Sequence, residues 1–323
     1  MKNRAIFGTV LATGLVLAAT TTPASADLVT RCIGTAGAVT VPGDLVVPAG
    51  QACTLTGTTV EGAVRVMAGA DLVVVDATFN DTVAVAADAY FDATTSTVAG
   101  TVTNRGFGVS LDRSELGGDV RGRAGTDASS FTYLYNSAVA GQVDARAGDL
   151  LLDSSQVTGQ VRGLGTTFVD VINSTLSGAL TVKDNTEGTS VCASEVDGET
   201  RLTGNTGVQV GDGDLLGSCT DGANYFGSSL QISNTTAGVS VRGNIIRGDL
   251  TGTGNDPAPT GGGNRVRGTL GGQFADMAAT AQVQARARVL AAQPDRGTEA
   301  RTQLEQRRTA AVTAATEAGP AQL

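Results

Sequence analysis

The chain of 323 residues has no histidine and no tryptophan, and only 4% of its residues are aromatic. Without histidine, Ser-His-Asp and Cys-His catalysis and the HExxH metallohydrolases are excluded. The only lysine beyond Lys2 is Lys183, which no glycine-rich loop precedes, so a phosphate-binding P-loop is excluded as well. Such a scarcity of aromatic rings also argues against a sugar-binding cleft with many subsites.

Basic residues are outnumbered, with 22 Lys and Arg against 31 Asp and Glu, which gives a net charge of −9. A field of this sign repels the phosphates of DNA and RNA. We therefore expect no nucleic-acid partner. Carboxylates are the main catalytic resource that remains, and the sequence predicts no cofactor.

The four cysteines are Cys32, Cys53, Cys192 and Cys219. An even number in an exported chain indicates disulfides, and pairing within each near pair is the simplest of the three possible connectivities. A zinc site would require a CxxC spacing or histidines, and both are absent. We expect no metal site.

Residues 1–26 have the pattern of a secretory signal peptide. A short basic start is followed by an apolar run from Ala5 to Thr20 and by the small residues Ala24-Ser25-Ala26. Cleavage before Asp27 removes Lys2 and Arg4, which changes the net charge from −9 to −11. The apolar run is short for a membrane span of about 20 residues, so we expect a secreted protein, extracellular or associated with the cell wall, with no stable membrane anchor.

A small polar residue, an aliphatic residue and a glycine recur about every nineteen residues, in the order polar-x-aliphatic-x-Gly. The recurring segments begin at Thr58, Ser96, Ser114, Ser137, Ser155, Ser174 and Ser194. Aliphatic residues stand two before and two after the glycine, and polar or small residues lie between them. This alternation, rich in β-branched residues, is typical of a short strand with one buried face.

One such unit cannot bury its apolar face alone, whereas stacked units bury the columns of Val and Leu against one another. The frame places Leu215 and Cys219 in the inward columns of its last regular unit, so that a Cys192–Cys219 bridge would brace neighbouring coils. A Cys32–Cys53 bridge would staple the cap that precedes the first clear coil. The sequence thus predicts an all-β fold, a right-handed parallel β-helix of about 10–12 coils over residues 27–274. A leucine-rich horseshoe is the alternative, but its L-x-x-L-x-L-x-x-N pattern is absent.

Near the end of this region the residues form a second kind of pattern. They read Gly243-Asn244-Ile245-Ile246-Arg247-Gly248, then Gly254-Asn255-Asp256-Pro257, then Gly263-Asn264-Arg265-Val266-Arg267-Gly268. This segment resembles the closing segment of secreted actinobacterial right-handed β-helix repeat proteins, whose functions are mostly unknown. Gly252 and Phe274 stand where that group has cysteines. The resemblance implies the fold and export, and it carries no catalytic residue across.

Residues 275–323 form a tail rich in Ala, Arg and Gln. Two helices are expected, Met277 to Gln293 and Thr298 to Ala318, separated by Pro294 to Gly297. Both have few large apolar residues, and isolated helices of this length are marginal in water. The composition favours a frayed or disordered tail over a helix that docks or oligomerises.

Carboxylates could act in glycoside cleavage if two of them faced each other at a suitable distance. Asp112 and Asp153 share one position of the repeat two coils apart, which separates them by about 10 Å. Asn136 and Asn173 fall close to the same column. A file of Asp and Asn at a coil corner is explained most simply by hydrogen bonds to the turn.

Another column contains Arg121, Asp144 and Arg162 on consecutive coils. We expect a solvated face with charges that alternate in sign; the functional alternative is a groove in which arginines bind the carboxylates of an acidic polysaccharide. The aromatic residues that could stack on sugars are Tyr133, Tyr135, Tyr225 and Phe226. Gly211 to Asp214 and Gly252 to Asp256 resemble calcium-roll motifs but occur singly, which favours turns. An ice-binding array would need repeated Thr-x-Thr, and only Thr101 to Thr103 fits.

From the sequence we expect an exported, non-catalytic β-helix with a structural or surface- and glycan-binding role at or outside the cell wall. The alternative is a polysaccharide lyase or glycoside hydrolase that acts on acidic glycans, with calcium as a cofactor for the lyase. Its catalytic residues would be Asp112, Asp144, Asp153, Arg121 and Arg162.

Overall fold

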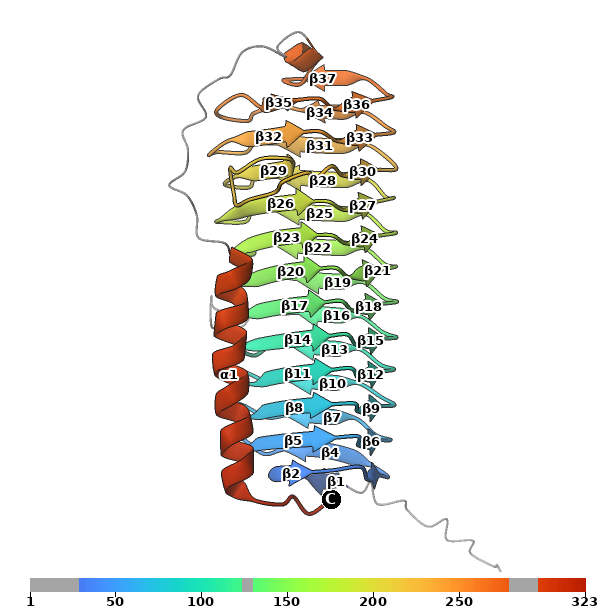
Figure 1. Cartoon of the computed structure of the whole chain (residues 1–323), viewed down its shortest axis with the longest axis vertical. Helices are drawn as coiled ribbons and strands as arrows, with labels where there is room; N and C mark the ends of the chain where they lie inside the picture. The colour runs from blue at the N-terminus through green and yellow to red at the C-terminus, as the bar shows by residue number, and fades with distance from the viewer. Residues whose placement is uncertain (1–28, 124–129, 279–295) are drawn as a thin grey trace, which may run out of the picture.

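The computed structural model describes residues 29–123, 130–278 and 296–323. It is a parallel β-solenoid of about thirteen turns with one C-terminal helix alongside (Figure 1). The expected signal peptide at 1–26 lies outside the described residues. So does most of the first expected helix, of which only Met277 and Ala278 are described, at the end of the 3-10 helix η1 (Ala275–Ala278).

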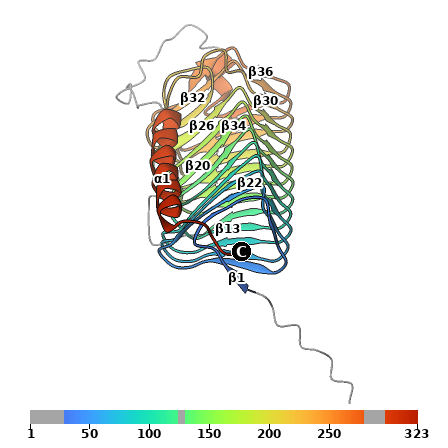
Figure 2. The same cartoon turned by 60° about the horizontal axis from the view of Figure 1, so that its bottom comes forward.

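Three parallel sheets, here called A, B and C, enclose the core, and each coil contributes one strand to each sheet (Figure 2). The strands of sheet A are β1 (Val29–Arg31), β4 (Asp44–Val47), β7 (Val64–Val66), β10 (Val83–Val85), β13 (Val102–Asn104), β16 (Val120–Gly122), β19 (Val143–Ala145), β22 (Val161–Leu164), β25 (Leu180–Lys183), β28 (Thr200–Thr203), β31 (Leu230–Ser233), β34 (Leu250–Gly252) and β37 (Leu270–Gly272). The strands of sheet B are β2 (Gly34–Ala36), β5 (Ala52–Thr56), β8 (Asp71–Val75), β11 (Tyr90–Thr94), β14 (Gly108–Asp112), β17 (Phe131–Tyr135), β20 (Asp149–Asp153), β23 (Phe168–Ile172), β26 (Gly188–Cys192), β29 (Val208–Gly211), β32 (Val239–Arg242) and β35 (Thr260–Gly262). The strands of sheet C are β3 (Thr40–Val41), β6 (Thr59–Val60), β9 (Thr78–Phe79), β12 (Thr97–Val98), β15 (Glu115–Leu116), β18 (Ala138–Val139), β21 (Gln156–Val157), β24 (Thr175–Leu176), β27 (Glu195–Val196), β30 (Tyr225–Phe226), β33 (Ile245–Ile246) and β36 (Arg265–Val266).

The aliphatic columns of the repeat form the core, as the sequence predicts. Val98, Leu116, Val139 and Val157 lie on consecutive coils of sheet C, and each is at most 2% exposed. Burial of each such side chain stabilises the fold by roughly 1.5–3 kcal/mol. The solenoid begins at Val29, before the first clear repeat, so it has slightly more coils than the ten to twelve expected.

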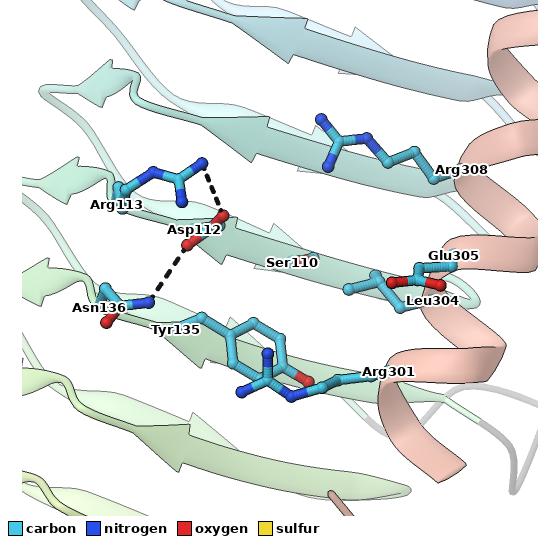
Figure 3. A pocket seen from close by; sticks show the side chains of 9 residues that line it. All are labelled: Ser110, Asp112, Arg113, Tyr135, Asn136, Arg301, Leu304, Glu305 and Arg308. Carbon is cyan, nitrogen blue, oxygen red and sulfur yellow. Dashed lines mark hydrogen bonds and ion pairs between the residues drawn. The ribbon is translucent and has the colours of Figure 1, made fainter. Parts of the chain in front are cut away.

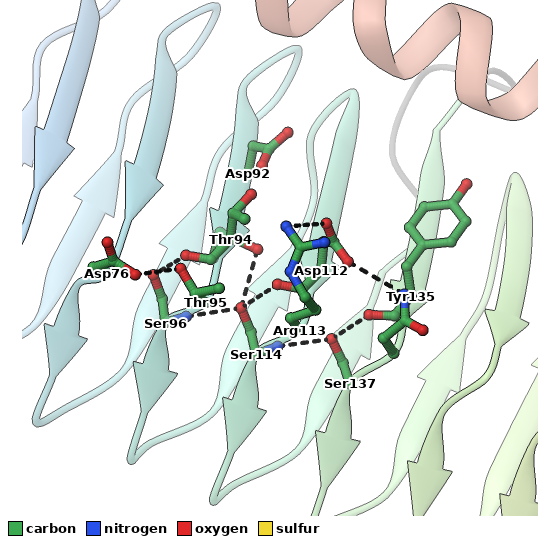
Figure 4. Close-up of polar contacts among 12 residues, drawn as sticks. Asp76, Asp92, Thr94, Thr95, Ser96, Asp112, Arg113, Ser114, Tyr135 and Ser137 are labelled. Carbon is green, nitrogen blue, oxygen red and sulfur yellow. Dashed lines mark hydrogen bonds and ion pairs between the residues drawn. The ribbon is translucent and has the colours of Figure 1, made fainter.

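The small polar residue of the repeat forms a buried hydrogen-bond ladder (Figure 4). The Ser114 amide donates to Ser137 Oγ on the next coil, and the Ser137 amide donates to Ser155 Oγ, at 3.1 and 3.2 Å. Each of these hydroxyls in turn donates to a carbonyl two residues back, as Ser137 Oγ does to Tyr135 at 2.8 Å. The ladder therefore satisfies backbone groups at the corner between sheets B and C, where the strands end.

The corner residue before this ladder has a left-handed backbone. Asn136 and Asn173 both have a φ of 49°. Asparagine tolerates this conformation better than most residues, which is in keeping with a role in the turn.

One coil is longer than the repeat predicts. The ladder passes from Ser194 directly to Asn224, thirty residues later, because the residues between β29 and β30 form an inserted loop. Phe226 and Leu230 occupy the inward columns that the sequence frame assigned to Leu215 and Cys219. That assignment was wrong, since Gly217 imitates the repeat spacing but lies within the insertion.

The C-terminal helix α1 (Arg296–Ala318) docks along sheet B and is not a frayed tail. It buries Arg296, Ala300, Ala311 and Ala315. Its 23 residues rise about 34 Å. Seven coil spacings, from β2 to β23, also cover about 34 Å, so the helix matches the stretch it covers.

The end of the chain returns to the first coil. The Thr35 amide donates to the Gly319 carbonyl at 2.9 Å, and the Ala321 amide donates to the Thr35 carbonyl at 2.8 Å. This short parallel pairing covers part of the open edge of sheet B at β2, an edge that would otherwise be free to pair with another chain.

The glycine of the repeat is required because adjacent coils approach closely. A Cβ atom on Gly159 would lie 2.5 Å from the Gly141 carbonyl oxygen of the preceding coil. We predict that Gly159→Ala lowers the free energy of unfolding by about 1–3 kcal/mol through overpacking. Gly37, where an added Cβ meets nothing within 4 Å, provides the control Gly37→Ala. Urea unfolding measures both, and equal stability of the two variants would contradict this account of the glycine column.

Candidate functional site

The largest feature outside the core is the contact between α1 and the outer face of sheet B, here called the α1–sheet B interface. It forms a second apolar cluster in which Tyr90, Phe131 and Tyr133 lie beneath Ala300 and Ala311. The Phe131 and Tyr133 rings stack with centroids 4.4 Å apart. Sheet B is therefore buried on both faces, whereas the repeat pattern predicts only one buried face.

Arginines of α1 reach carboxylates on sheet B. Arg296 forms an ion pair with Asp170 at 2.6 Å, and both side chains are at most 6% exposed. Its guanidinium also lies 4.9 Å from the centre of the Phe168 ring and donates to the Glu187 carbonyl. Removal of one partner from such a buried pair costs about 3–5 kcal/mol, so this contact fixes the start of the helix.

Two further arginines repeat this arrangement. Arg307 pairs with Asp71 at 2.7 Å and lies 5.0 Å from the centre of the Phe107 ring. Arg301 pairs with Asp153 at 2.6 Å and lies over Tyr135. The helix is thus held at three heights along the stack by a cation that touches both a carboxylate and an aromatic ring.

Removal from water changes the acidity of carboxyls under the helix. Burial raises the pKa of Asp170 from 3.8 to about 6, against the effect of the Arg296 guanidinium. Burial also raises the pKa of Asp149 from 3.8 to about 6, although Tyr133 donates a hydrogen bond to it at 3.1 Å. Both carboxyls therefore titrate near pH 6 in the folded chain.

The structure places Asp112 and Asp153 at the rim of the α1–sheet B interface. They align two coils apart with Tyr135 between them, as the sequence frame predicts for the two carboxylates. Asp153 pairs with Arg301, and Asp112 pairs with Arg113 at 3.0 Å and accepts a hydrogen bond from Asn136.

The other candidates, Arg121, Asp144 and Arg162, align on consecutive coils of sheet A. The described ion pairs of Arg121 and Asp144 run within one coil: Arg121 binds Asp119 at 2.7 Å, and Asp144 binds Arg146 at 3.1 Å. The expected alternation of sign is present, but the pairing between coils is not. The five candidates are divided between two sheets and do not share one groove.

Three of the four aromatic residues that could stack on sugars are buried. Tyr133 and Phe226 are fully covered, and Tyr135 is 3% exposed. Tyr133 and Tyr135 pack in the α1–sheet B interface, and Phe226 packs in the solenoid core. Only Tyr225 remains partly exposed.

A small polar cavity of about 200 Å³ lies between α1 and sheet B, below the usual size of a ligand pocket (Figure 3). Its walls carry Ser110, Asp112, Arg113, Tyr135, Asn136, Arg301, Leu304, Glu305 and Arg308. Its lining holds three arginines and two carboxylates, and each arginine has a carboxylate partner: Arg113 pairs with Asp112, Arg301 with Asp153 and Arg308 with Asp92.

The residues that could bind a metal do not gather. Within residues 29–123, 130–278 and 296–323, no cluster of three or more Cys, Asp or Glu side chains could hold an ion. Asp212, in one of the two calcium-like runs, accepts a hydrogen bond from the Gly222 amide in the inserted loop. In the same described part of the chain, no helix has the length and apolar character needed to cross a bilayer.

The two disulfides join the near pairs. Cys32–Cys53 joins the segment between β1 and β2 to β5 on the next coil, as expected for a staple of the cap. Cys192–Cys219 ties the inserted loop to the end of β26. It therefore anchors a loop rather than bracing an inward column.

Sequence comparisons add no relative: no family model, no curated protein and no solved structure matches this chain.

The buried carboxyls predict an unusual dependence of stability on pH. Between about pH 4 and 6 the folded chain holds protons on Asp149 and Asp170 that the unfolded chain releases, so these groups make stability fall as pH rises through this range. We expect Asp149→Asn to reduce that fall, because the amide does not titrate. Urea unfolding at about pH 5 and about pH 7 measures it.

The exposed carboxyl of Asp197 provides the control. In Asp197→Asn the free energy of unfolding should change between the two pH values by as much as it does in the parent. If the free energy of unfolding of Asp149→Asn also changed by as much as that of the parent, Asp149 would not be a source of the pH dependence.

Proposed function

We propose that this chain is an exported, non-catalytic β-helix with a structural or surface- and glycan-binding role at or outside the cell wall. The observation that carries the proposal is the α1–sheet B interface. It covers one complete side of seven coil spacings and engages the carboxylates there with arginines. The solenoid is therefore a rod in which the C-terminal helix covers the outer face of sheet B along these coils.

Export is supported by the disulfides together with the signal-peptide pattern. All four cysteines are paired, which fits an oxidising compartment. Each bridge joins residues no more than 27 positions apart, and each ties down a part of the chain that the repeat does not hold, the first cap and the inserted loop. A rod of stacked coils with such staples suits a role outside the cell.

The geometry favours binding over glycan cleavage. A lyase or hydrolase would need Asp112, Asp144 or Asp153 in one groove with Arg121 or Arg162 and an accessible tyrosine. Asp112 and Asp153 lie at the rim of α1, on sheet B. Asp144 does lie between the two arginines on sheet A, but Tyr133 and Tyr135 are buried under α1 and Tyr225 lies on sheet C. For this reason the enzyme is the weaker candidate, and calcium has no role in the proposal.

Incubation with glycans tests the proposal. The mature chain, with pectin, alginate and cell-wall glycans, with and without calcium, should release no unsaturated or reducing ends above the level of a protein-free blank. A commercial polysaccharide lyase serves as the positive control. Product release that disappears in Asp112→Asn, Asp144→Asn or Asp153→Asn would overturn the non-catalytic assignment.

A further inference from the structure

Cations gather on the outer surface of sheet A, although the whole chain is acidic. From β13 to β28, the side chains that point outward on or beside this sheet include seven basic residues, here called the basic face. They are Arg105, Arg121, Arg123, Arg146, Arg162, Lys183 and Arg201. The chain as a whole carries −9.

The β-sheet register spaces these cations regularly. Arg121, Arg162 and Arg201 occupy one column on alternate coils, with Asp144 and Thr181 on the coils between them. Alternate coils are about 9.6 Å apart, so the three guanidinium groups span about 19 Å along the axis of the stack. A second file lies two residues further along each strand and includes Arg123, Arg146 and Lys183.

The carboxylates along this face neutralise only part of its charge. Four lie on or beside the same strands, and each pairs with one basic residue: Asp119 with Arg121, Asp144 with Arg146, Asp184 with Lys183 and Glu199 with Arg201. Within the described ranges, no ion pair involves Arg105, Arg123 or Arg162. Three guanidinium groups of this face are therefore available to an external anion.

The face has the character of a surface for a hydrated polymer. The exposed large apolar side chains of the described residues all lie outside β13 to β28, so an insertion into lipid has no anchor here. Polar neighbours such as Thr103, Gln142, Gln160 and Thr181 offer hydrogen bonds to hydroxyl groups.

We infer that the basic face of sheet A binds a linear polysaccharide that carries carboxylates, laid along the stack of coils. Repeated carboxylates would meet guanidinium groups at successive coils, in bonds that arginine forms well. The inference rests on the proposed function, since a binding face without cleavage is its premise. It uses sheet A, which forms a different side of the stack from sheet B (Figure 2). Of the candidate carboxylates, Asp112 and Asp153 lie on sheet B, whereas Asp144 lies within the basic face, paired with Arg146.

Affinity electrophoresis tests this inference, with the mature chain in gels that contain sodium polygalacturonate, sodium alginate or neutral dextran. We expect the two acidic polymers to retard the chain, dextran to leave it unaffected, and added salt to weaken the retardation. The variant R105Q/R123Q/R162Q should weaken binding by about tenfold, equal to about 1.4 kcal/mol.

The matched control is R247Q/R265Q/R267Q, which removes the same charge from exposed arginines at the C-terminal end of the stack, on and beside sheet C. It should retain parental binding, and circular dichroism should show both triple variants folded. Equal loss in both variants, or equal retardation by dextran, overturns the basic face as the site. Tighter binding to a DNA oligonucleotide or to phosphatidylglycerol vesicles overturns the ligand class.

The glycan-cleavage assay keeps the two proposals distinguishable. Binding without product release supports both. Product release with normal binding overturns the non-catalytic function alone, and loss of binding without product release overturns only the inference on the basic face.

Discussion

Hydrogen bonding from each coil to the next is the constraint on which the rest of the structure depends. The backbone of each strand between the two ends of the stack pairs in parallel with the strands above and below it, so the coils repeat at the spacing of a β-sheet. The same spacing aligns Val and Leu into a dry interior, requires glycine where carbonyls approach, and sets each serine hydroxyl within reach of the preceding coil's amide. A residue that disturbs this spacing at one coil displaces its neighbours as well.

The helix and the basic face both follow from that spacing. A straight helix can dock on sheet B because the sheet places carboxylates and aromatic rings at regular heights. Arg296, Arg301 and Arg307 each contact one carboxylate and one ring. On sheet A the same periodicity arranges arginines into files. One side of the rod is thus used to bind the chain's own C-terminal helix. We propose that another side is free to bind a partner with a matching repeat.

The sequence predicted the solenoid well because alternation and period report burial directly. Docking of α1 was missed because its buried positions are Ala and Arg, whereas a core face is usually sought in large apolar residues. Strands of sheet B have five residues and carry aromatic side chains, such as Tyr133 and Tyr135, at positions that point away from the solenoid core. These outward aromatic residues were the sequence signal that a second layer covers this face. The inserted loop was missed because Gly217 preserves the spacing by coincidence. Asp112 and Asp153 lie on sheet B, whereas the other three candidates lie on sheet A. This division depends on where each coil turns, which the local sequence pattern does not encode.

Hydrogen exchange of the backbone amides tests the central claim most directly. The amides of Ser114, Ser137 and Ser155 lie at coil corners and have only the serine hydroxyl of the next coil as acceptor. The account predicts that they exchange as slowly as amides in the adjoining strands of sheet B. Exchange at the rate of an exposed loop, while those strands stay protected, would show that the coils are not joined in this way.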